Sequence, residues 1–279
     1  MSQIHLEFFS MFNEALRNSI PYKTTVIPKG MTFDDFTPII TEESLAGSFP
    51  TSCNLNSFMP DVITQVGNTC VGCAVTNAIQ FRYMNTLDQP FNLLRSILFI
   101  YYNARVYEDT TNADSGCFVV DAVKGITEIG ACNYTYWPFV ESNITVKPPL
   151  TAYEDASNFN QIFETRQINQ DLNSIKTALC IQQYPVICGI NVYSSWNALS
   201  TIETGNIPYP LPTETYVGAH CLLLTGYDDS LQLFNVQNSY GTPWGVHGYG
   251  TIPYKYILNI TLAPFDELWI IGNNVNNLL

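Results

Sequence analysis

The chain has 279 residues, of which 46% are apolar and only 13% are charged, a balance typical of a globular protein. This composition excludes disordered, collagen-like and coiled-coil proteins, and the length allows one or two domains with a large core. Lys and Arg number 11 against 24 Asp and Glu, so the formal net charge of -13 argues against nucleic acid or an anionic membrane as a partner.

The first 48 residues predict an arm that precedes the main domain. Apolar side chains recur at helical spacing through residues 3–18, and Pro21 ends that pattern. This stretch lacks the continuous apolar centre of a secretory signal, and no apolar run reaches the roughly 18 residues of a membrane-spanning helix. We therefore expect an arm at residues 1–48, acting as a pro-segment or a lid, and a main domain at residues 49–279. The oligomeric state and the compartment stay open, with virion, host cytoplasm and endolysosome as candidates.

The first half of the main domain predicts helices. A buried helix is expected from Cys70 onward, because small or apolar residues recur at i, i+3 and i+4 spacing at Val71, Ala74, Val75, Ala78 and Ile79. Further helices are expected at residues 93–105 and 118–129, and Gly130 would end the second of these.

The second half predicts short strands, at residues 185–193, 220–227, 231–237 and 249–254. A hairpin turn at Asp228-Asp-Ser would join the middle two. Helices followed by strands indicate an α+β fold with a helical subdomain and a β-rich subdomain.

Three histidines limit the candidates for any chemistry that needs an imidazole. His5 lies in the arm, and His247 lies in a glycine-rich loop, where we assign it no role. His220 opens an apolar run, which predicts a position at the start of a buried strand, partly withdrawn from water. Taken alone, His220 would be read as a hydrogen-bonded core histidine.

A second motif changes that interpretation. One hairpin beyond His220, a strand is expected to end at Asn238, and a loop that contains Trp244 follows. The amide of Asn238 can accept the imidazole N–H and fix the tautomer of the ring, while Trp244 can cover that hydrogen bond from water.

A nucleophile is predicted where the loop at residues 65–69 becomes a helix. Cys70 would be placed at the positive end of that helix, and a nearby imidazolium would further favour the thiolate over the thiol. The backbone N–H of Cys70 and the side-chain amide of Gln65 could then stabilise the oxyanion of an attacked carbonyl. The opposing interpretation is that free cysteines are usually small buried hydrophobes, and we apply it to Cys73.

These motifs together resemble the papain-like, or cathepsin-like, cysteine proteases of peptidase family C1. His220 resembles the catalytic histidine, and Asn238-Ser-Tyr-Gly-Thr-Pro-Trp-Gly resembles the catalytic asparagine motif, with Tyr240 where most members have Trp. Residues 49–65 resemble the start of the mature enzyme up to its oxyanion glutamine, and the likeness is nearest to bacterial and large-virus members.

The resemblance implies a helical left subdomain, a β-barrel-like right subdomain and an active-site cleft between them. It implies a thiol endopeptidase in which Cys70, His220 and Asn238 form the triad and Gln65 serves the oxyanion. Gly116 and Trp244 would bind substrate. The expected partner is a polypeptide substrate, and no metal or other cofactor is expected.

One departure from the family pattern leaves the register of the nucleophile open. The family usually has six residues from glutamine to cysteine, whereas here the distance from Gln65 is five to Cys70 and eight to Cys73. The papain register would make Cys73 catalytic and place Cys70 in a disulfide, but the usual partner is absent, since Cys117 follows Gly116 instead. On the helical stripe Cys73 is expected to point away from Ala74, so we assign the nucleophile to Cys70.

Two alternative functions accompany this prediction. The altered loop between Gln65 and Cys70, together with Tyr240, is compatible with a catalytically silent papain-fold protein that binds or assembles. The segment Gly67-Asn-Thr-Cys also resembles the cysteine box of ubiquitin-specific proteases, which suggests an isopeptidase that acts on ubiquitin-like substrates.

Overall fold

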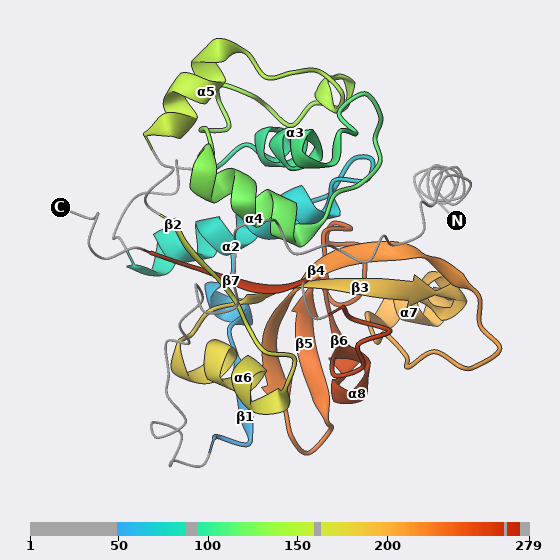
Figure 1. Cartoon of the computed structure of the whole chain (residues 1–279). Helices are drawn as coiled ribbons and strands as arrows, with labels where there is room; N and C mark the ends of the chain where they lie inside the picture. Colours follow the sequence, from blue (N-terminus) through green and yellow to red (C-terminus); the bar gives the residue numbers. More distant parts are fainter. Residues whose placement is uncertain (1–48, 87–93, 159–162, 265–266, 274–279) are drawn as a thin grey trace. The chain divides into compact units, whose positions relative to one another are not determined.

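The structure of the chain is a computed structural model that describes residues 49–86, 94–158, 163–264 and 267–273 (Figure 1). The described unit begins at Phe49. The arm at residues 1–48, with its predicted helix and its predicted role as a pro-segment or lid, lies outside the described residues. Among the helices of the described part, none is both long enough and apolar enough to cross a membrane.

The helical half of this unit lies on one side of the sheet in Figure 1 and is built from α2 Cys70–Thr86, α3 Ile97–Glu108, α4 Val119–Glu128 and α5 Leu150–Ser157. The helices predicted from Cys70 and at residues 118–129 are confirmed. The helix predicted at residues 93–105 begins later, because the Ser96 hydroxyl caps it by accepting the backbone N–H of Phe99 at 3.1 Å.

The other half is an antiparallel sheet whose described strands are β1 Ser52–Asn54, β2 Phe163–Gln167, β3 Val186–Tyr193, β4 Tyr216–Asp228, β5 Leu233–Gln237, β6 Tyr249–Pro253 and β7 Leu268–Asn273. Their order is β2-β7-β3-β4-β5-β6, and β1 pairs with β4. The path ends at β2 and β6, so the described sheet is open, and the barrel-like closure expected of the right subdomain is not formed by these strands. Helices beside an antiparallel sheet confirm the predicted α+β class.

Strand β4 is the longest strand of the described sheet, and it starts four residues before the predicted strand. It pairs with the whole of β3, from Val186 opposite Leu224 to Tyr193 opposite Tyr216. His220 therefore lies inside the strand, opposite Ile190, instead of at its first residue.

Short helices connect these elements, namely η4 Asn56–Phe58, η5 Glu141–Asn143, α6 Leu172–Lys176, η6 Thr177–Ile181, η7 Ser194–Asn197, α7 Leu199–Thr204 and α8 Tyr254–Ile257. In Figure 1, α6, α7 and α8 accompany the sheet, away from the helical half. Helix η7 begins at the residue after β3. Because β3 lies next to β4 in the sheet, the residues of η7 start close to β4.

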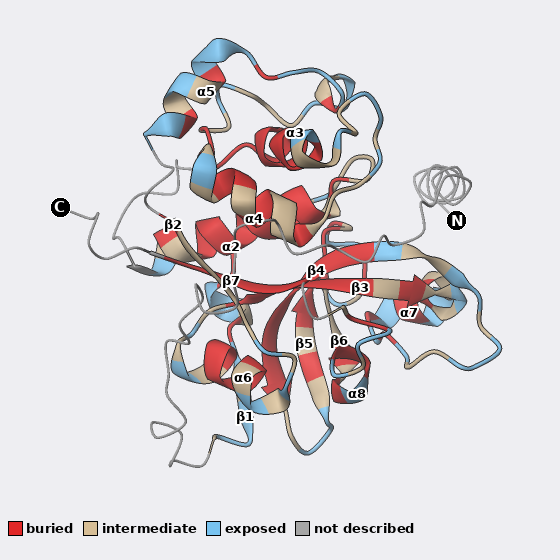
Figure 2. Ribbon diagram, in the orientation of Figure 1, coloured by how far each residue is buried: buried red, intermediate tan, exposed pale blue. Residues whose placement is uncertain are grey.

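Helix α2 is central, because it packs against α3 and α4 as well as against β3, β4 and β7. Figure 2 shows it buried along most of its length. Gly72 permits the approach of α3, since a Cβ atom there would lie 2.9 Å from the backbone oxygen of Ile97. Cys73 and Ala74 are both buried, so the helix is buried around more than one stripe. The predicted orientation of Cys73 away from Ala74 therefore does not show whether Cys70 or Cys73 is the nucleophile.

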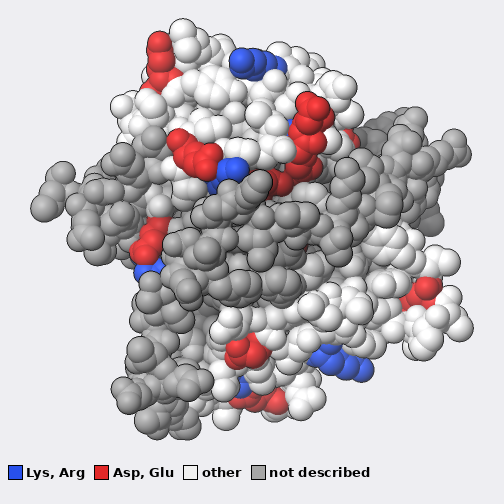
Figure 3. Space-filling model, in the orientation of Figure 1, with Lys and Arg blue, Asp and Glu red and all other residues white. Residues whose placement is uncertain are grey.

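Charged side chains are sparse on the surface. On the face drawn in Figure 3, acidic and basic groups stand singly or in small clusters among uncharged residues. The core instead consists of the apolar residues of the central helices and of strands β3, β4 and β7, which Figure 2 shows as buried.

Candidate active site

The imidazole of His220 and the amide of Asn238 lie in direct contact. His220 Nε2 and Asn238 Oδ1 are 2.7 Å apart, and both residues are buried. Strand β5 pairs with β4 up to Gln237, and the chain then turns out of the sheet, with the Asn238 N–H donating to the backbone oxygen of Gly248. The hairpin thus brings together two residues that lie 18 positions apart.

Hydrogen bonds around Asn238 define the tautomer of the ring. The backbone N–H of Ser239 donates to Asn238 Oδ1 at 2.8 Å, which identifies this atom as the amide oxygen. An oxygen without a proton can only accept, so Nε2 of His220 carries the hydrogen and Nδ1 carries a lone pair, which makes it an acceptor. Burial lowers the pKa of His220 to about 4, and the Asn238 hydrogen bond acts in the opposite direction. The ring is therefore neutral at pH 7, with Nδ1 as its basic atom.

Two aromatic side chains contact this histidine, and a third packs behind them. The ring centroids of Tyr240 and Trp196 lie 4.8 and 5.1 Å from that of His220. Trp244, which the sequence analysis expects to shield the hydrogen bond, stacks on Trp196 at 6.2 Å and is itself buried. Trp196 was missed by the sequence analysis, because nothing near residue 196 indicates that η7 approaches β4.

Gln65 is tied to the same loop as Asn238. Its amide oxygen accepts the hydroxyl of Ser239 at 2.7 Å, and its backbone N–H donates to the backbone oxygen of Ser239 at 2.8 Å. Its amide nitrogen donates to the backbone oxygen of Gly67 at 2.9 Å. One hydrogen of Nε2 is thereby used, and the second stays available to another acceptor.

Asp114 anchors the loop that leads to Cys70. One carboxylate oxygen accepts the backbone N–H of Asn68 at 2.9 Å, and the other accepts the hydroxyl of Tyr101 at 2.5 Å. The same Tyr101 oxygen accepts the N–H of Gly116 at 2.9 Å. Gly67 has a φ of 57°, and a Cβ atom there would lie 2.2 Å from Asp114 Oδ2, so glycine is required at this close approach.

Cys70 is the first residue of α2 and keeps partial solvent exposure. Its protein surroundings nevertheless raise the pKa of its thiol to about 11, chiefly through burial. Hydrogen bonds from backbone N–H groups oppose this rise, and the largest of them comes from Cys221, the residue that follows His220. The thiol of Cys70 is therefore within reach of the backbone N–H of Cys221, on the strand that carries the candidate histidine.

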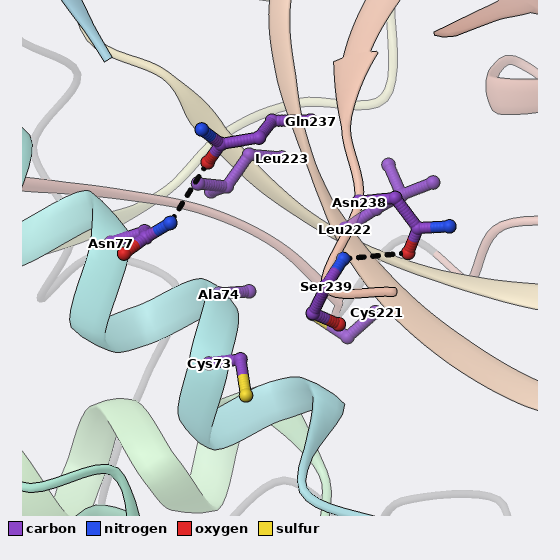
Figure 4. Close-up of a pocket in the computed structure, with 9 residues that line it drawn as sticks. All are labelled: Cys73, Ala74, Asn77, Cys221, Leu222, Leu223, Gln237, Asn238 and Ser239. Atoms are coloured by element: carbon purple, nitrogen blue, oxygen red, sulfur yellow. Dashed lines mark hydrogen bonds between the residues drawn. The ribbon is translucent and has the colours of Figure 1, made fainter. Parts of the chain in front are cut away.

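Cys73 has different surroundings. It is 1% exposed, burial raises the pKa of its thiol, and its sulfur lies 3.8 Å from the Thr69 hydroxyl oxygen. In Figure 4 this sulfur is turned away from the amide of Asn238. Cys73 lines a small pocket between α2 and the hairpin of β4 and β5, together with Ala74, Asn77, Cys221, Leu222, Leu223, Gln237, Asn238 and Ser239.

The remaining predicted residues are placed as follows. Gly116 has a φ of 77°, and a Cβ atom there would meet open space. A negative charge on Cys70 would help to raise the pKa of Cys117, the residue after Gly116, so this segment lies within electrostatic range of the candidate nucleophile. His247 is exposed, as expected for a loop residue. Within the described residues, no group of three or more acidic, histidine or cysteine side chains could hold a metal ion.

All eight cysteines of the chain lie among the described residues and carry free thiols. Cys70 is therefore not held in a disulfide, and its sulfur is free to act as a nucleophile. This observation is compatible with the assignment of the nucleophile to Cys70.

No protein-family model matches the chain. The chain is 30% identical over 223 residues to an uncharacterized peptidase C1-like protein of Acanthamoeba polyphaga mimivirus, and the match covers 76% of this chain and 71% of that protein. This likeness agrees with the large-virus branch that the sequence motifs indicate.

Solved structures agree with this relationship. Xylellain, a cysteine protease from Xylella fastidiosa, is similar with a TM-score of 0.78 and 30% identity, covering 91% of this chain and 97% of that one. Procathepsin B from Trypanosoma congolense, at 14% identity, shares the fold with a TM-score of 0.63 over 98% of this chain and 97% of its own. The expected papain-like fold is thereby confirmed.

Proposed function

The chain belongs to the papain-like cysteine proteases, a family of peptide-bond hydrolases, and on this premise we propose that it is an endopeptidase with Cys70 as its nucleophile. The observation that carries the proposal is the 2.7 Å hydrogen bond between His220 Nε2 and Asn238 Oδ1, because it makes Nδ1 the basic atom of a buried ring. The thiol of Cys70 within reach of the backbone N–H of Cys221 supports the same assignment.

Proton transfer between sulfur and imidazole starts the reaction. Considered alone, each group is neutral at pH 7, because burial raises the pKa of Cys70 to about 11 and lowers that of His220 to about 4. When the thiol proton moves to Nδ1 of His220, a negative sulfur faces a positive ring, and their attraction offsets much of the cost of burying both charges. The N–H groups at the start of α2 further favour the thiolate.

The thiolate of Cys70 then attacks the carbonyl carbon of the peptide bond. The carbonyl oxygen becomes an oxyanion, which the second Nε2 hydrogen of Gln65 and the backbone N–H of Cys70 stabilise. His220 gives its Nδ1 proton to the amide nitrogen as the C–N bond breaks, and the amine product leaves a thioester on Cys70.

Hydrolysis of the thioester completes the cycle. Nδ1 of His220 takes a proton from water, the hydroxide attacks the thioester carbon, and the sulfur leaves as a thiolate that recovers a proton. Asn238 holds the ring so that Nδ1 faces the reacting atoms throughout.

We place the substrate backbone at Gly116, because the space at its α carbon is open and its segment lies within electrostatic range of Cys70. Trp244 is 3% exposed, so its contribution to substrate binding acts through the side chains that it supports, Trp196 and Tyr240.

Bond cleavage inside a peptide, read by mass spectrometry of the products, distinguishes an endopeptidase from an exopeptidase.

A covalent epoxysuccinyl probe tests the proposal. The probe should label the wild-type protein and the Cys73→Ala variant, should leave Cys70→Ala unlabelled, and its adduct should map to Cys70. Of these three proteins, only Cys70→Ala should lose the ability to hydrolyse a peptide mixture. Cys73→Ala is the matched control, since it removes a thiol three residues along the same helix.

Other results of the probe experiment would point to another nucleophile or to another function. Labelling that follows Cys73 would move the nucleophile by one helical turn. An unlabelled wild type without peptide hydrolysis would indicate a papain-fold protein that binds without catalysis. Labelling of Cys70 with cleavage of only an isopeptide-linked ubiquitin substrate would indicate the isopeptidase.

A further inference from the structure

The hydroxyl of Tyr240 reaches the nitrogen of His220 that the proposed reaction uses. Tyr240 Oη lies 3.5 Å from His220 Nδ1, and the two ring centroids are 4.8 Å apart. The backbone of Tyr240 is held by an antiparallel bridge to Thr64, the residue before Gln65. The phenol is therefore anchored to the loop that precedes the candidate nucleophile.

The direction of this hydrogen bond follows from the tautomer. Because Nε2 of His220 carries its hydrogen towards Asn238, Nδ1 of the neutral ring can only accept, so the phenol O–H must donate to it. The indole N–H of Trp196 in turn donates to the phenol oxygen, an interaction that lowers the pKa of Tyr240. The single phenol proton is thus directed away from Trp196 and towards the imidazole.

The same hydroxyl also lies within electrostatic range of the Cys70 thiol. A negative charge on Cys70 contributes to raising the pKa of Tyr240, together with burial. The phenol consequently stays protonated and can donate a hydrogen bond beside a thiolate. Tyr240 therefore contacts the histidine of the reacting pair and lies within electrostatic range of its cysteine.

We propose that Tyr240, oriented by Trp196, is a third hydrogen-bonding group of the reacting pair and stabilises its thiolate–imidazolium form. This inference rests on the proposed function. The phenol can donate to the thiolate and can accept from the imidazolium, and hydrogen bonds to charged partners are about twice as strong as those to neutral ones. An indole at position 240 has no oxygen that could serve in this way.

Other titratable groups around the pair must be kept constant in a test. Those that act on the Cys70 thiol, or on which its charge acts, are Asp114, Cys73, Cys117, Cys221 and Tyr240 itself. Within the described residues, the polar side chains that contact the His220 ring are the phenol of Tyr240 and the uncharged amide of Asn238. Replacing Tyr240 by Phe removes one hydroxyl and leaves every other group in place.

The experiment measures the rate of Cys70 alkylation by iodoacetamide against pH, with the adduct located by mass spectrometry. In the wild type the rate rises with pH as the protonated pair, thiol with imidazolium, loses one proton and becomes the thiolate–imidazolium ion pair. In Tyr240→Phe that rise should move upward by about 1 pH unit, which is a tenfold weaker preference for the ion pair. An unchanged or downward-shifted curve overturns the proposal.

Two further variants separate the hydroxyl from the bulk of the ring. Tyr240→Trp keeps a large aromatic side chain without the hydroxyl and should show the same upward shift as Tyr240→Phe. Trp196→Phe keeps the ring on His220 but removes the donor to the phenol, so it should give a smaller shift. In the double variant with Tyr240→Phe, the Trp196 change should add nothing to the shift. Full additivity would show that Trp196 acts only through packing.

This design keeps two failures apart. If alkylation in the wild type does not single out Cys70, the proposed function fails. If Cys70 is selectively alkylated and the pH curve of Tyr240→Phe matches the wild type, only the role of Tyr240 fails. Equal thermal unfolding midpoints for wild type and variants show that a shift does not come from partial unfolding, and a Tyr240→Phe protein that does not fold is replaced by Tyr240→Trp.

Discussion

The two parts of the candidate site are held in place by different means. His220 and Asn238, on what we call the sheet side, are positioned by the register of β4 and β5 and by the rings of Trp196 and Tyr240. Gln65 and Cys70, on what we call the loop side, are positioned by side-chain hydrogen bonds around residues 65–70 and by Asp114.

The difference teaches where each side is vulnerable. Many backbone hydrogen bonds share the positioning of the sheet side, so truncating one side chain there should remove chemistry while the fold persists. The loop side depends on a few polar contacts, and each lost contact leaves a buried or partly buried partner unpaired. Mutations on the two sides should therefore separate loss of turnover from loss of stability.

Apart from the loss of the nucleophile itself, the largest effect on turnover is expected on the sheet side, at His220. Replacing His220 by Ala removes the acid and base, so kcat/KM for peptide hydrolysis should fall by roughly 10³–10⁴-fold. His247→Asn is the matched control, because His247 is exposed with a φ of 57°, which Asn tolerates. Equal losses in both variants would contradict the assignment.

On the loop side, Gln65→Ala should lower kcat for peptide hydrolysis by about 10²-fold, because it removes one donor to the oxyanion. The rate of Cys70 alkylation by iodoacetamide, which forms no oxyanion, should change far less. A parallel fall in both rates would show that Gln65 serves only to position the loop through Ser239.

Asp114 should give the clearest loss of stability. Asp114→Ala leaves the N–H of Asn68 and the hydroxyl of Tyr101 without their acceptor, so the free energy of unfolding should fall by about 2–4 kcal/mol. Denaturant unfolding measures this change. Asp114→Asn keeps one acceptor oxygen and should cost less than Asp114→Ala; an equal cost would mean that the carboxylate charge, and not its hydrogen bonds, holds the loop.

The effects of pH on stability differ in sign between the sheet side and the helical half. The pKa of His220 is lowered from 6.5 to about 4 by burial, so below pH 6.5 the unfolded chain binds a proton that the folded chain does not. The free energy of unfolding should therefore fall by about 3 kcal/mol as the pH drops from 6.5 towards 4.

Glu108 at the end of α3 should act in the opposite sense. Burial raises its pKa from 4.5 to about 7, so the folded chain keeps a proton that the unfolded chain releases, and stability should fall as the pH rises between these values. Glu108→Gln should flatten the neutral side of the stability curve and His220→Gln the acid side, as read by thermal unfolding at several pH values. A curve that neither variant changes would assign the dependence to other groups.

The sequence alone was sufficient for features encoded within a few neighbouring residues. The helix from Cys70, the strand that contains His220 and the loop that begins at Asn238 are predicted from periodicity, turn residues and motif spacing, and the structure confirms these elements. The sequence predicts which residues stand at a helix start or a strand end because these are local features, and this was enough to propose the roles of Cys70, His220 and Asn238.

Only the tertiary structure decided what surrounds those residues. The contact of Trp196 with His220, the two hydrogen bonds that Asp114 makes to Asn68 and Tyr101, and the direction of the Tyr240 hydroxyl join segments that are distant in the sequence. Strand β7 likewise pairs with β2 about a hundred residues away. Such contacts depend on strand register and on packing summed over the whole core, which no short stretch of sequence encodes.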